Sequence, residues 1–265
     1  MISGYGLHSG ADCQVWLHRE PGGVRFKRGE TIIPARVDAV VATPRCTVLG
    51  QAGVQVALVE HLLAALHARG WWSDVLIEVT GEEVPILDGS AAGWLEEIEM
   101  LGAAPEPPLG FTLSQTLVYE ENGSRICAEP AAALLEVSVD YDHPLIGKQQ
   151  WKGLPKDYEN LLDARTFGFI AEVEALRARG LATRAGLENV IVFTDTGSLN
   201  PLRHANEPVR HKALDALGDF FLLEQPLHAR LSITKGSHHA HVDFMKQLLP
   251  LLKPATGAVT KASRS

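Results

Sequence analysis

The feature that most constrains the fold is a stretch in the second half of the chain, residues 209–221, whose sequence is typical of a buried amphipathic helix. Its apolar residues recur at spacings of three and four, which places them on one side of a helix: Leu214, Leu217 and Phe221. Asn206 is of a type that commonly caps a helix start, and Pro208 suits the first turn, where its missing N–H costs nothing. The pattern predicts a helix over residues 207–223 with one side in a core.

The same helix carries a second stripe, which is polar. His211, Asp215 and Asp219 stand four residues apart, so their side chains project from one face of the helix. An imidazole and a carboxylate one turn apart can bind a single metal ion. The alternative is a surface helix with solvated side chains, because this spacing is common. Since the other side of the helix is apolar, we interpret the polar stripe as functional.

Charge and cysteine content exclude several classes of protein. A formal net charge of −8 argues against a general nucleic-acid binder, although a local basic pocket for a phosphorylated ligand is compatible with it. Three widely spaced cysteines without a CxxC pair indicate no disulfide framework and a reducing compartment. No segment reaches the roughly 18 apolar residues that span a bilayer, and residues 1–6 do not resemble a secretory signal. We expect a cytoplasmic protein with at most peripheral membrane contact.

A proline-rich segment divides the chain. Residues 103–110 hold three prolines in four positions, which is typical of a stiff linker. The order of predicted elements is similar on its two sides. We therefore predict two α+β domains of comparable size that face one another, residues 1–104 and 110–252. The polar tail 253–265 is expected to be mobile.

Periodicity, glycines and prolines set the expected elements. Before the linker we expect strands at 13–18 and 23–26 around a turn at 21–23, a strand at 74–80, and helices at 57–69 and 91–101. After it we expect strands at 112–119, 124–128, 134–140, 189–194 and 229–234, and helical segments at 158–164, 171–179, 207–223 and 242–252.

The third metal ligand must come from another segment, because a catalytic zinc keeps three protein ligands and one open position. The best candidate is His61, near the start of an apolar helix. The adjacent Glu60 can then reach a water molecule without occupying the metal, as a general base requires. The alternative is that neither residue has a catalytic role: the helix dipole favours a glutamate at the helix start, and the histidine next to it is half exposed.

Two further segments can complete a hydrolytic site. Residues 235–241 contain His238, His239 and His241, and a cationic histidine there can stabilise an oxyanion or protonate a leaving amine. Spacing does not decide which histidine acts, and a surface loop is the alternative. Asp219 can orient such a histidine.

Residues 164–169 place a hydroxyl, Thr166, between a cation and two aromatic rings. Thr166 can bond a substrate oxyanion, and Phe167 can form an apolar or sugar-stacking wall. Lys212 and Lys235 can bind a phosphate, although ordinary surface lysines are the alternative.

Six segments together resemble one family, the metal-dependent deacetylases of lipid A biosynthesis, which act on UDP-3-O-acyl-N-acetylglucosamine. They occur in the family's order and span most of residues 4–250. The segments are 6–10 (GLHSG), 59–63 (VEHLL), 84–91 (VPILDGSA), 142–144 (DHP), 164–169 (ARTFGF) and 209–219 (VRHKALDALGD).

The resemblance implies a fold and a chemistry. The fold is α+β, with two stacked α/β-sandwich domains whose helical layers face inward and enclose the metal site. A βαβ insert near 171–196 would form a passage for the acyl chain. The activity would be a zinc-dependent amide hydrolysis that releases acetate, with Fe²⁺ as the alternative metal. The partner would be a UDP-linked acylated amino sugar, and we expect a monomer.

The resemblance also assigns roles to individual residues. It implies His61, His211 and Asp215 as metal ligands. It implies Glu60 as the general base, Thr166 as the hydroxyl that contacts the carbonyl and oxyanion, His238 as the catalytic histidine and Asp219 as its carboxylate partner. Lys212, Lys235 and Phe167 would contact the substrate.

The segment around the catalytic histidine departs from the family. Ser237 stands where the family has a glycine, a position that can require a positive φ, and residues 239–241 replace the usual x-Leu-Asn. His239 therefore stays an alternative catalytic histidine. Only three residues precede Gly4, where the family usually has an additional strand, so the sequence does not decide which strand forms the edge of the first sheet. The alternative function is a catalytically degenerate homologue that binds a nucleotide-sugar or acyl ligand.

Overall fold

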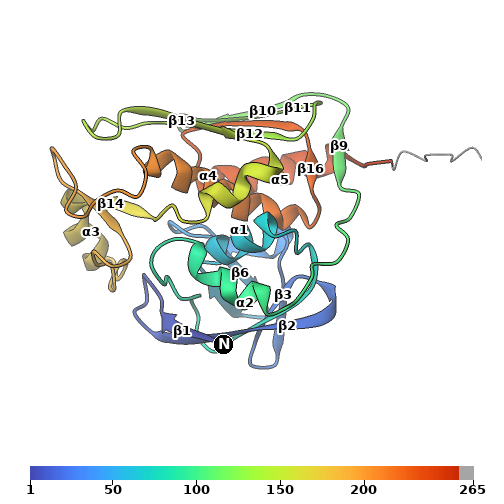
Figure 1. The fold of residues 1–265 in the computed structure, drawn as a ribbon, viewed down its shortest axis with the longest axis horizontal. Helices are drawn as coiled ribbons and strands as arrows, with labels where there is room; N and C mark the ends of the chain where they lie inside the picture. Colours follow the sequence, from blue (N-terminus) through green and yellow to red (C-terminus); the bar gives the residue numbers. More distant parts are fainter. Residues whose placement is uncertain (257–265) are drawn as a thin grey trace, which may run out of the picture.

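The computed structural model describes residues 1–256 and shows an α+β fold in which helices lie between two five-stranded sheets (Figure 1). The first sheet has the order β1-β2-β8-β3-β4, with β1 (Ile2–Tyr5), β2 (Asp12–Gly23), β3 (Arg25–Arg28), β4 (Thr31–Pro34) and β8 (Ser73–Val79). The second has the order β10-β11-β17-β12-β13, with β10 (Leu117–Glu121), β11 (Ser124–Glu129), β12 (Leu134–Asp140), β13 (Lys148–Gly153) and β17 (Arg230–Thr234).

The two sheets share one topology. Each has a single parallel pair, β3 with β8 and β12 with β17, while its other neighbours are antiparallel. A parallel pair needs a crossover connection, which commonly contains a helix. Helix α1 (Glu60–Ala68) precedes β8, and helix α4 (Glu207–Phe220) precedes β17. The similar element order expected from the sequence is therefore present as a repeat of strand order and direction.

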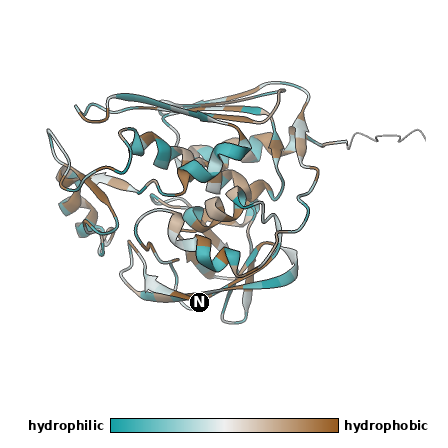
Figure 2. Cartoon of the chain, in the orientation of Figure 1, coloured by the Kyte–Doolittle hydropathy of each residue, from teal (hydrophilic) through white to brown (hydrophobic). Residues whose placement is uncertain are grey.

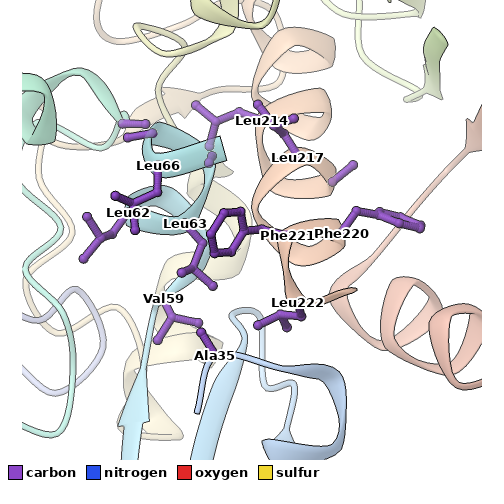
Figure 3. Packing of buried hydrophobic residues seen from close by; sticks show 14 of the residues in the cluster. Ala35, Val59, Leu62, Leu63, Leu66, Leu214, Leu217, Phe220, Phe221 and Leu222 are labelled. Carbon is purple, nitrogen blue, oxygen red and sulfur yellow. The ribbon is translucent and has the colours of Figure 1, made fainter. Parts of the chain in front are cut away.

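The main core lies where α1 meets α4. Figure 2 shows apolar segments on the helices between the sheets, alternating with hydrophilic ones. Figure 3 shows the side chains that fill this contact, and all of those named here are at most 2% exposed: Leu62, Leu63, Leu66, Leu214, Leu217 and Phe221. The helix predicted over 207–223 is confirmed, because a 3-10 turn (Phe221–Leu223) continues α4.

A glycine allows the two helices to touch through their backbones. A Cβ added at Gly218 of α4 would lie 2.0 Å from the carbonyl oxygen of Glu60, the first residue of α1. No larger residue fits without displacing one helix. This contact fixes the first turn of α1 against the last turn of α4.

Smaller sheets and helices complete the fold. One sheet joins β5 (Val40–Ala42), β6 (Val48–Gln51) and β7 (Val54–Ala57), and another joins β9 (Phe111–Leu113), β16 (Leu227–His228) and β18 (Leu252–Pro254). The parallel strands β14 (Phe167–Phe169) and β15 (Ile191–Phe193) enclose α3 (Val173–Ala178) in sequence. The remaining α-helices are α2 (Leu95–Glu99) and α5 (His238–Leu248). Further 3-10 helices cover Val37–Ala39, Ala92–Trp94, Pro155–Leu161, Ile170–Glu172 and Leu249–Leu251.

Several predicted boundaries were wrong. The turn expected at 21–23 lies inside β2, whose register with β8 shifts between Arg19 and Gly23, and β8 lies between β2 and β3. The strand expected at 112–119 is divided into β9 and β10, and β13 was not predicted. Helix α5 begins four residues earlier than the predicted helix at 242.

The ends of the predicted linker and tail can also be compared with the structure. Residues 103–110 form neither helix nor strand. The tail predicted from residue 253 was placed too early, because Leu252–Pro254 pairs with β9. Its remainder, 257–265, lies outside the described residues.

Two findings bear on membranes and redox state. Within residues 1–256, none of the helices has the length and apolar content needed to cross a bilayer. The absence of a disulfide framework is confirmed, because Cys13, Cys46 and Cys127 are all free and buried.

The contact at Gly218 can be tested by Gly218→Ala. In an unobstructed helix this change stabilises by about 0.5–1 kcal/mol. Here we expect a loss of about 1–3 kcal/mol, because the added methyl overlaps the Glu60 carbonyl. Urea unfolding measures the difference. Gly197→Ala is the control, since its Cβ would have no neighbour closer than 3.7 Å. A stabilised Gly218→Ala variant would contradict the close contact.

Candidate active site

The three expected metal ligands lie together between the two sheets. His61 comes from α1, while His211 and Asp215 come from α4, and one ligand atom of each lies within 4.8 Å of the others. The Asp215 Oδ1 is 3.2 Å from His211 Nε2 and 3.9 Å from His61 Nε2. All three side chains are buried. The structure therefore brings one imidazole from the first half of the chain to an imidazole–carboxylate pair from the second.

The protonation states of His61 and His211 suit the binding of a metal cation. The Nδ1 of His211 lies 3.1 Å from the Ala164 carbonyl oxygen, so that nitrogen donates its proton and leaves Nε2 with a free lone pair. Burial lowers the pKa of His211, and burial together with the charge of His211 lowers the pKa of His61 to about 3. The His61 Nδ1 has no partner among the described residues. Two neutral imidazoles and a carboxylate are a suitable donor set for zinc or iron(II).

Lys212 is paired with the carboxylate of this cluster. Its Nζ lies 2.7 Å from Asp215 Oδ2. Burial alone would raise the pKa of Asp215, but the charges of His211 and Lys212 hold it well below its usual range. Burial would lower the pKa of Lys212, but Asp215 raises it. Asp215 is therefore ionised at neutral pH, with one oxygen bonded to Lys212 and the other facing the imidazoles.

Glu60 directly precedes the expected ligand His61 on α1, and one of its oxygens has no hydrogen-bond partner among the described residues. Its Oε2 accepts the Thr47 N–H at 3.0 Å, and its Oε1 lies 3.7 Å from His238 Nε2. Burial raises the pKa of Glu60 to about 7, although the charge of His238 opposes the shift. A carboxylate with a pKa near neutrality can both accept and return a proton.

His238 is held in the site by a hydrogen bond, whereas the neighbouring His239 lies outside the site. The His238 Nδ1 donates to Asp219 Oδ2 at 2.7 Å. Burial would lower the pKa of His238, but the charges of Asp219 and Glu60 raise it to about 9, so the ring is cationic at neutral pH. His239 has 56% of its side chain exposed, and its Nε2 lies near Glu121 and Asp243 instead.

The backbone before His238 is not strained at the serine. Ser237 has a φ of −143°, and its Oγ caps α5 by accepting the Ala240 N–H at 3.2 Å. Position 237 therefore does not require a positive φ, and the positive φ of this segment falls on Lys235, at 51°. The serine therefore strengthens the helix start that carries His238.

Thr47 is a member of the site that sequence reasoning missed. It is fully buried, and its Oγ1 donates to Asp219 Oδ1 at 2.6 Å while its N–H bonds Glu60. It lies immediately before β6, and a threonine at the start of a strand is ordinary. Only the folded arrangement reveals that one residue links two carboxylates from different halves of the chain.

The expected substrate-contacting residues are divided between the site and its surroundings. The Phe167 ring lies 6.3 Å from the His211 ring, at an edge-to-face angle. Thr166 is fixed by its backbone, which donates to Gly89 O at 2.7 Å and accepts from Ile191 N at 2.9 Å. Lys235 lies at the end of β17, half exposed, with Nζ 3.6 Å from Asp140.

A buried ion pair anchors the segment before Thr166 to the start of α4. The carboxylate of Glu207 accepts from Arg165 N at 3.0 Å and Arg165 Nε at 2.9 Å, and from Arg203 N at 2.6 Å. The expected capping by Asn206 was wrong, because its side chain makes no cap bond and instead accepts from Arg210 Nε at 2.8 Å. Glu207 thus ties the helix bearing His211 to the strand that follows Thr166.

Comparisons with known proteins identify the family to which the sequence belongs. The model of the UDP-3-O-acyl N-acetylglycosamine deacetylase family (LpxC) matches residues 1–250. A UDP-3-O-acyl-N-acetylglucosamine deacetylase of Thermosynechococcus vestitus is 40% identical over 257 residues, which cover 93% of this chain and 90% of that protein. Proteins of the same name from Aliarcobacter butzleri and Nitratidesulfovibrio vulgaris are 36% and 37% identical, covering 93% of this chain and 86% and 84% of theirs. The resemblance drawn from six segments is confirmed over nearly the whole chain.

The ion pair predicts a pH-dependent contribution to stability. Burial would raise the pKa of Glu207, but hydrogen bonds from Arg165 and Arg203 hold it below the ordinary value. A lowered folded-state pKa contributes stability above the unfolded pKa, and this stability is lost as the pH falls. We expect Glu207→Gln to lose on the order of 3 kcal/mol at pH 7, because Arg165 stays charged and buried.

Urea unfolding of wild type and Glu207→Gln at several pH values checks this. The difference in unfolding free energy should shrink as the pH falls below about 4.3, the ordinary pKa of a glutamate. Glu106→Gln, at an exposed position of the linker, is the control and should match wild type throughout. A difference that stays constant with pH would show that Glu207 acts only through packing.

Proposed function

Because the chain belongs to the UDP-3-O-acyl N-acetylglycosamine deacetylase family, we propose that it hydrolyses the N-acetyl group of UDP-3-O-acyl-N-acetylglucosamine and releases acetate, in lipid A biosynthesis. One observation carries the proposal. A buried His-His-Asp donor set lies next to a carboxylate, Glu60, and a cationic imidazole, His238. Hydrolysis of an unactivated amide needs an electrophile, a base and an acid, and this arrangement offers all three.

The metal would be held by His61, His211 and Asp215, with zinc as the expected ion and iron(II) as the alternative. When bound, such an ion supplies Lewis acidity, which polarises an amide carbonyl and makes a nearby water more acidic. The chain's own contribution is to keep both imidazoles neutral and the carboxylate charged. Lys212 supports the charged state of Asp215.

Glu60 would act as the general base. Its Oε2 is bonded to the Thr47 N–H, so Oε1 is the oxygen available to take a proton from the attacking water. The raised pKa of Glu60, about 7, suits a group that must accept this proton and then release it. The water oxygen forms a bond to the acetyl carbon as its proton moves to Oε1.

His238 and Thr166 would stabilise the negative charge that develops on the carbonyl oxygen. Because the His238 Nδ1 is committed to Asp219, the Nε2 proton of the cationic ring is the one available to the substrate. When the C–N bond breaks, the departing amine takes a proton from His238 or from the protonated Glu60. Acetate and the free amino sugar are the products.

The remaining expectations from the resemblance form part of this proposal. Lys235 and Lys212 would contact the phosphorylated part of the substrate, and Phe167 would face the sugar. The segment 171–196 would form the passage for the acyl chain. Residues 1–104 and 110–252 would act as two stacked domains that meet at the site. A cytoplasmic location and a monomeric state stay predictions.

The direct test is acetate release. Purified, metal-supplied protein is incubated with UDP-3-O-acyl-N-acetylglucosamine, and acetate and free amine are quantified. Stoichiometric release of both supports the proposal. Saturable binding of the substrate without release would support the alternative, a homologue that binds a nucleotide-sugar without catalysis. Competition by the UDP-sugar that lacks the 3-O-acyl chain shows whether the acyl group contributes to recognition.

Metal content tests the proposed ligands without depending on activity. Wild-type protein purified with zinc supplied should hold one ion per chain. His61→Ala and Asp215→Asn should each hold less than half of that, because a divalent ion with two protein ligands is bound far more weakly. His18→Ala is the matched control, since His18 is an exposed histidine of β2 that belongs to none of the candidate metal-holding groups among the described residues. Full zinc content in both ligand variants would remove this site from the proposal.

Glu60→Gln tests the general base. The amide keeps an oxygen for the Thr47 N–H but cannot accept a proton, so folding and metal content should be retained. We expect kcat to fall by about 10²- to 10⁴-fold. Glu121→Gln, an exposed carboxylate near His239, is the control and should behave as wild type. Near-normal turnover by Glu60→Gln would exclude Glu60 as the base.

A further inference from the structure

The carboxylate of Asp219 receives hydrogen bonds from three side chains. Thr47 Oγ1 donates to its Oδ1 at 2.6 Å. Its Oδ2 receives two imidazole N–H donors, His238 Nδ1 and His241 Nδ1, each at 2.7 Å. Asp219 is fully buried, so no solvent replaces any of these bonds. The second imidazole is a feature that the mechanism above does not use.

The His241 ring is enclosed by its neighbours. It is fully buried, and its centroid lies 5.8 Å from that of Phe220. A Cβ added at Gly236 would lie 2.5 Å from His241 Nε2, so the ring fills the space that this glycine leaves. Among the described residues the Nε2 has no hydrogen-bond partner. The polar contact of the ring with the protein is therefore made through Nδ1 alone.

His241 also differs from His238 in charge. Burial lowers the pKa of His241, and this outweighs the attraction of Asp219. The ring is neutral at pH 7, with its single proton on Nδ1, where it is donated to Asp219. His241 thus supplies a hydrogen bond without adding a second positive charge beside His238.

We propose that His241 is a positioning residue, which fixes the Oδ2 of Asp219 so that His238 keeps its Nδ1 bonded to this oxygen and its Nε2 beside Glu60. Helix α5 carries both histidines on its first turn, three residues apart, so they approach the same carboxylate from one helix. The Nε2 of His238 lies 3.7 Å from Glu60 Oε1. If Oδ2 moved, His238 would turn away from the acetyl group. This inference rests on the proposed function.

Two substitutions separate the hydrogen bond from packing. In asparagine the amide nitrogen is attached to Cγ, as Nδ1 is in histidine, so His241→Asn keeps a donor at the same position along the side chain. His241→Leu fills much of the space but has no donor. His239→Asn makes the same chemical change two residues earlier, on an exposed side chain, and is the matched control.

The proposal predicts a split between kcat and KM. His241→Leu should lower kcat by about 10- to 100-fold, with KM and zinc content unchanged, because a misplaced His238 affects the chemical step. His241→Asn should stay much closer to wild type, and His239→Asn should equal wild type. If His241→Leu retains full kcat, or His241→Asn is as impaired as His241→Leu, the ring acts only by filling space and the proposal is overturned.

A spectroscopic measurement tests the role of His241 without depending on catalysis. In zinc-loaded protein with 15N-labelled histidine, the Nδ1–H protons of His238 and His241 should appear strongly downfield, because both are donated to a buried carboxylate. His241→Leu should remove one signal and shift that of His238, while His241→Asn should leave the His238 signal in place. An unshifted His238 signal in His241→Leu overturns the proposal. If wild type releases no acetate, the proposed function fails, and this measurement still decides the role of His241.

Discussion

The backbone contact between Gly218 of α4 and Glu60 of α1 is the constraint on which the site depends. Helices normally pack through their side chains at interaxial distances of 8–10 Å, whereas here a Cβ at position 218 would almost overlap the Glu60 carbonyl. The approach is close enough for the first turn of α1 to reach the polar stripe of α4. The apolar side chains in Figure 3 pack between the two helices and hold this geometry.

The close approach of the helices buries three carboxylates, and each has groups that stabilise its charge or a raised pKa. Asp215 is paired with Lys212 at 2.7 Å, and Asp219 receives three hydrogen bonds. Glu60 has one backbone N–H donor and the nearby charge of His238, and it is the carboxylate whose pKa rises to about 7. Removing one partner of such a group leaves an uncompensated buried charge. The site is therefore a network in which the pKa of each carboxylate is set by its burial, by the positive charges around it and by the hydrogen bonds it accepts.

Sequence reasoning found the groups that follow a pattern, missed Thr47, and named His241 as a candidate without deciding its role. The i, i+4 spacing on one amphipathic helix indicated His211, Asp215 and Asp219, and the structure gathers them in the interior. Thr47 and His241 follow no periodicity, since Thr47 lies immediately before a short strand and His241 lies in a run of histidines. Their contacts with Asp219 depend on residues distant in sequence, which local patterns cannot report. The early start of α5 has a similar cause, because Ser237 caps the helix by accepting the Ala240 N–H and the histidines that follow it show no helical periodicity.

The repeated topology of the two sheets has a thermodynamic consequence. Each half contributes one central helix, and the donor set of His61 with His211 and Asp215 is divided between them. An ion held by all three would be a cross-link between the halves, and its binding free energy would add to the affinity of one half for the other. Loss of the ion would then weaken the association of the two halves as well as remove the electrophile. By linkage, any force that separates the halves would weaken the retention of the ion to the same degree.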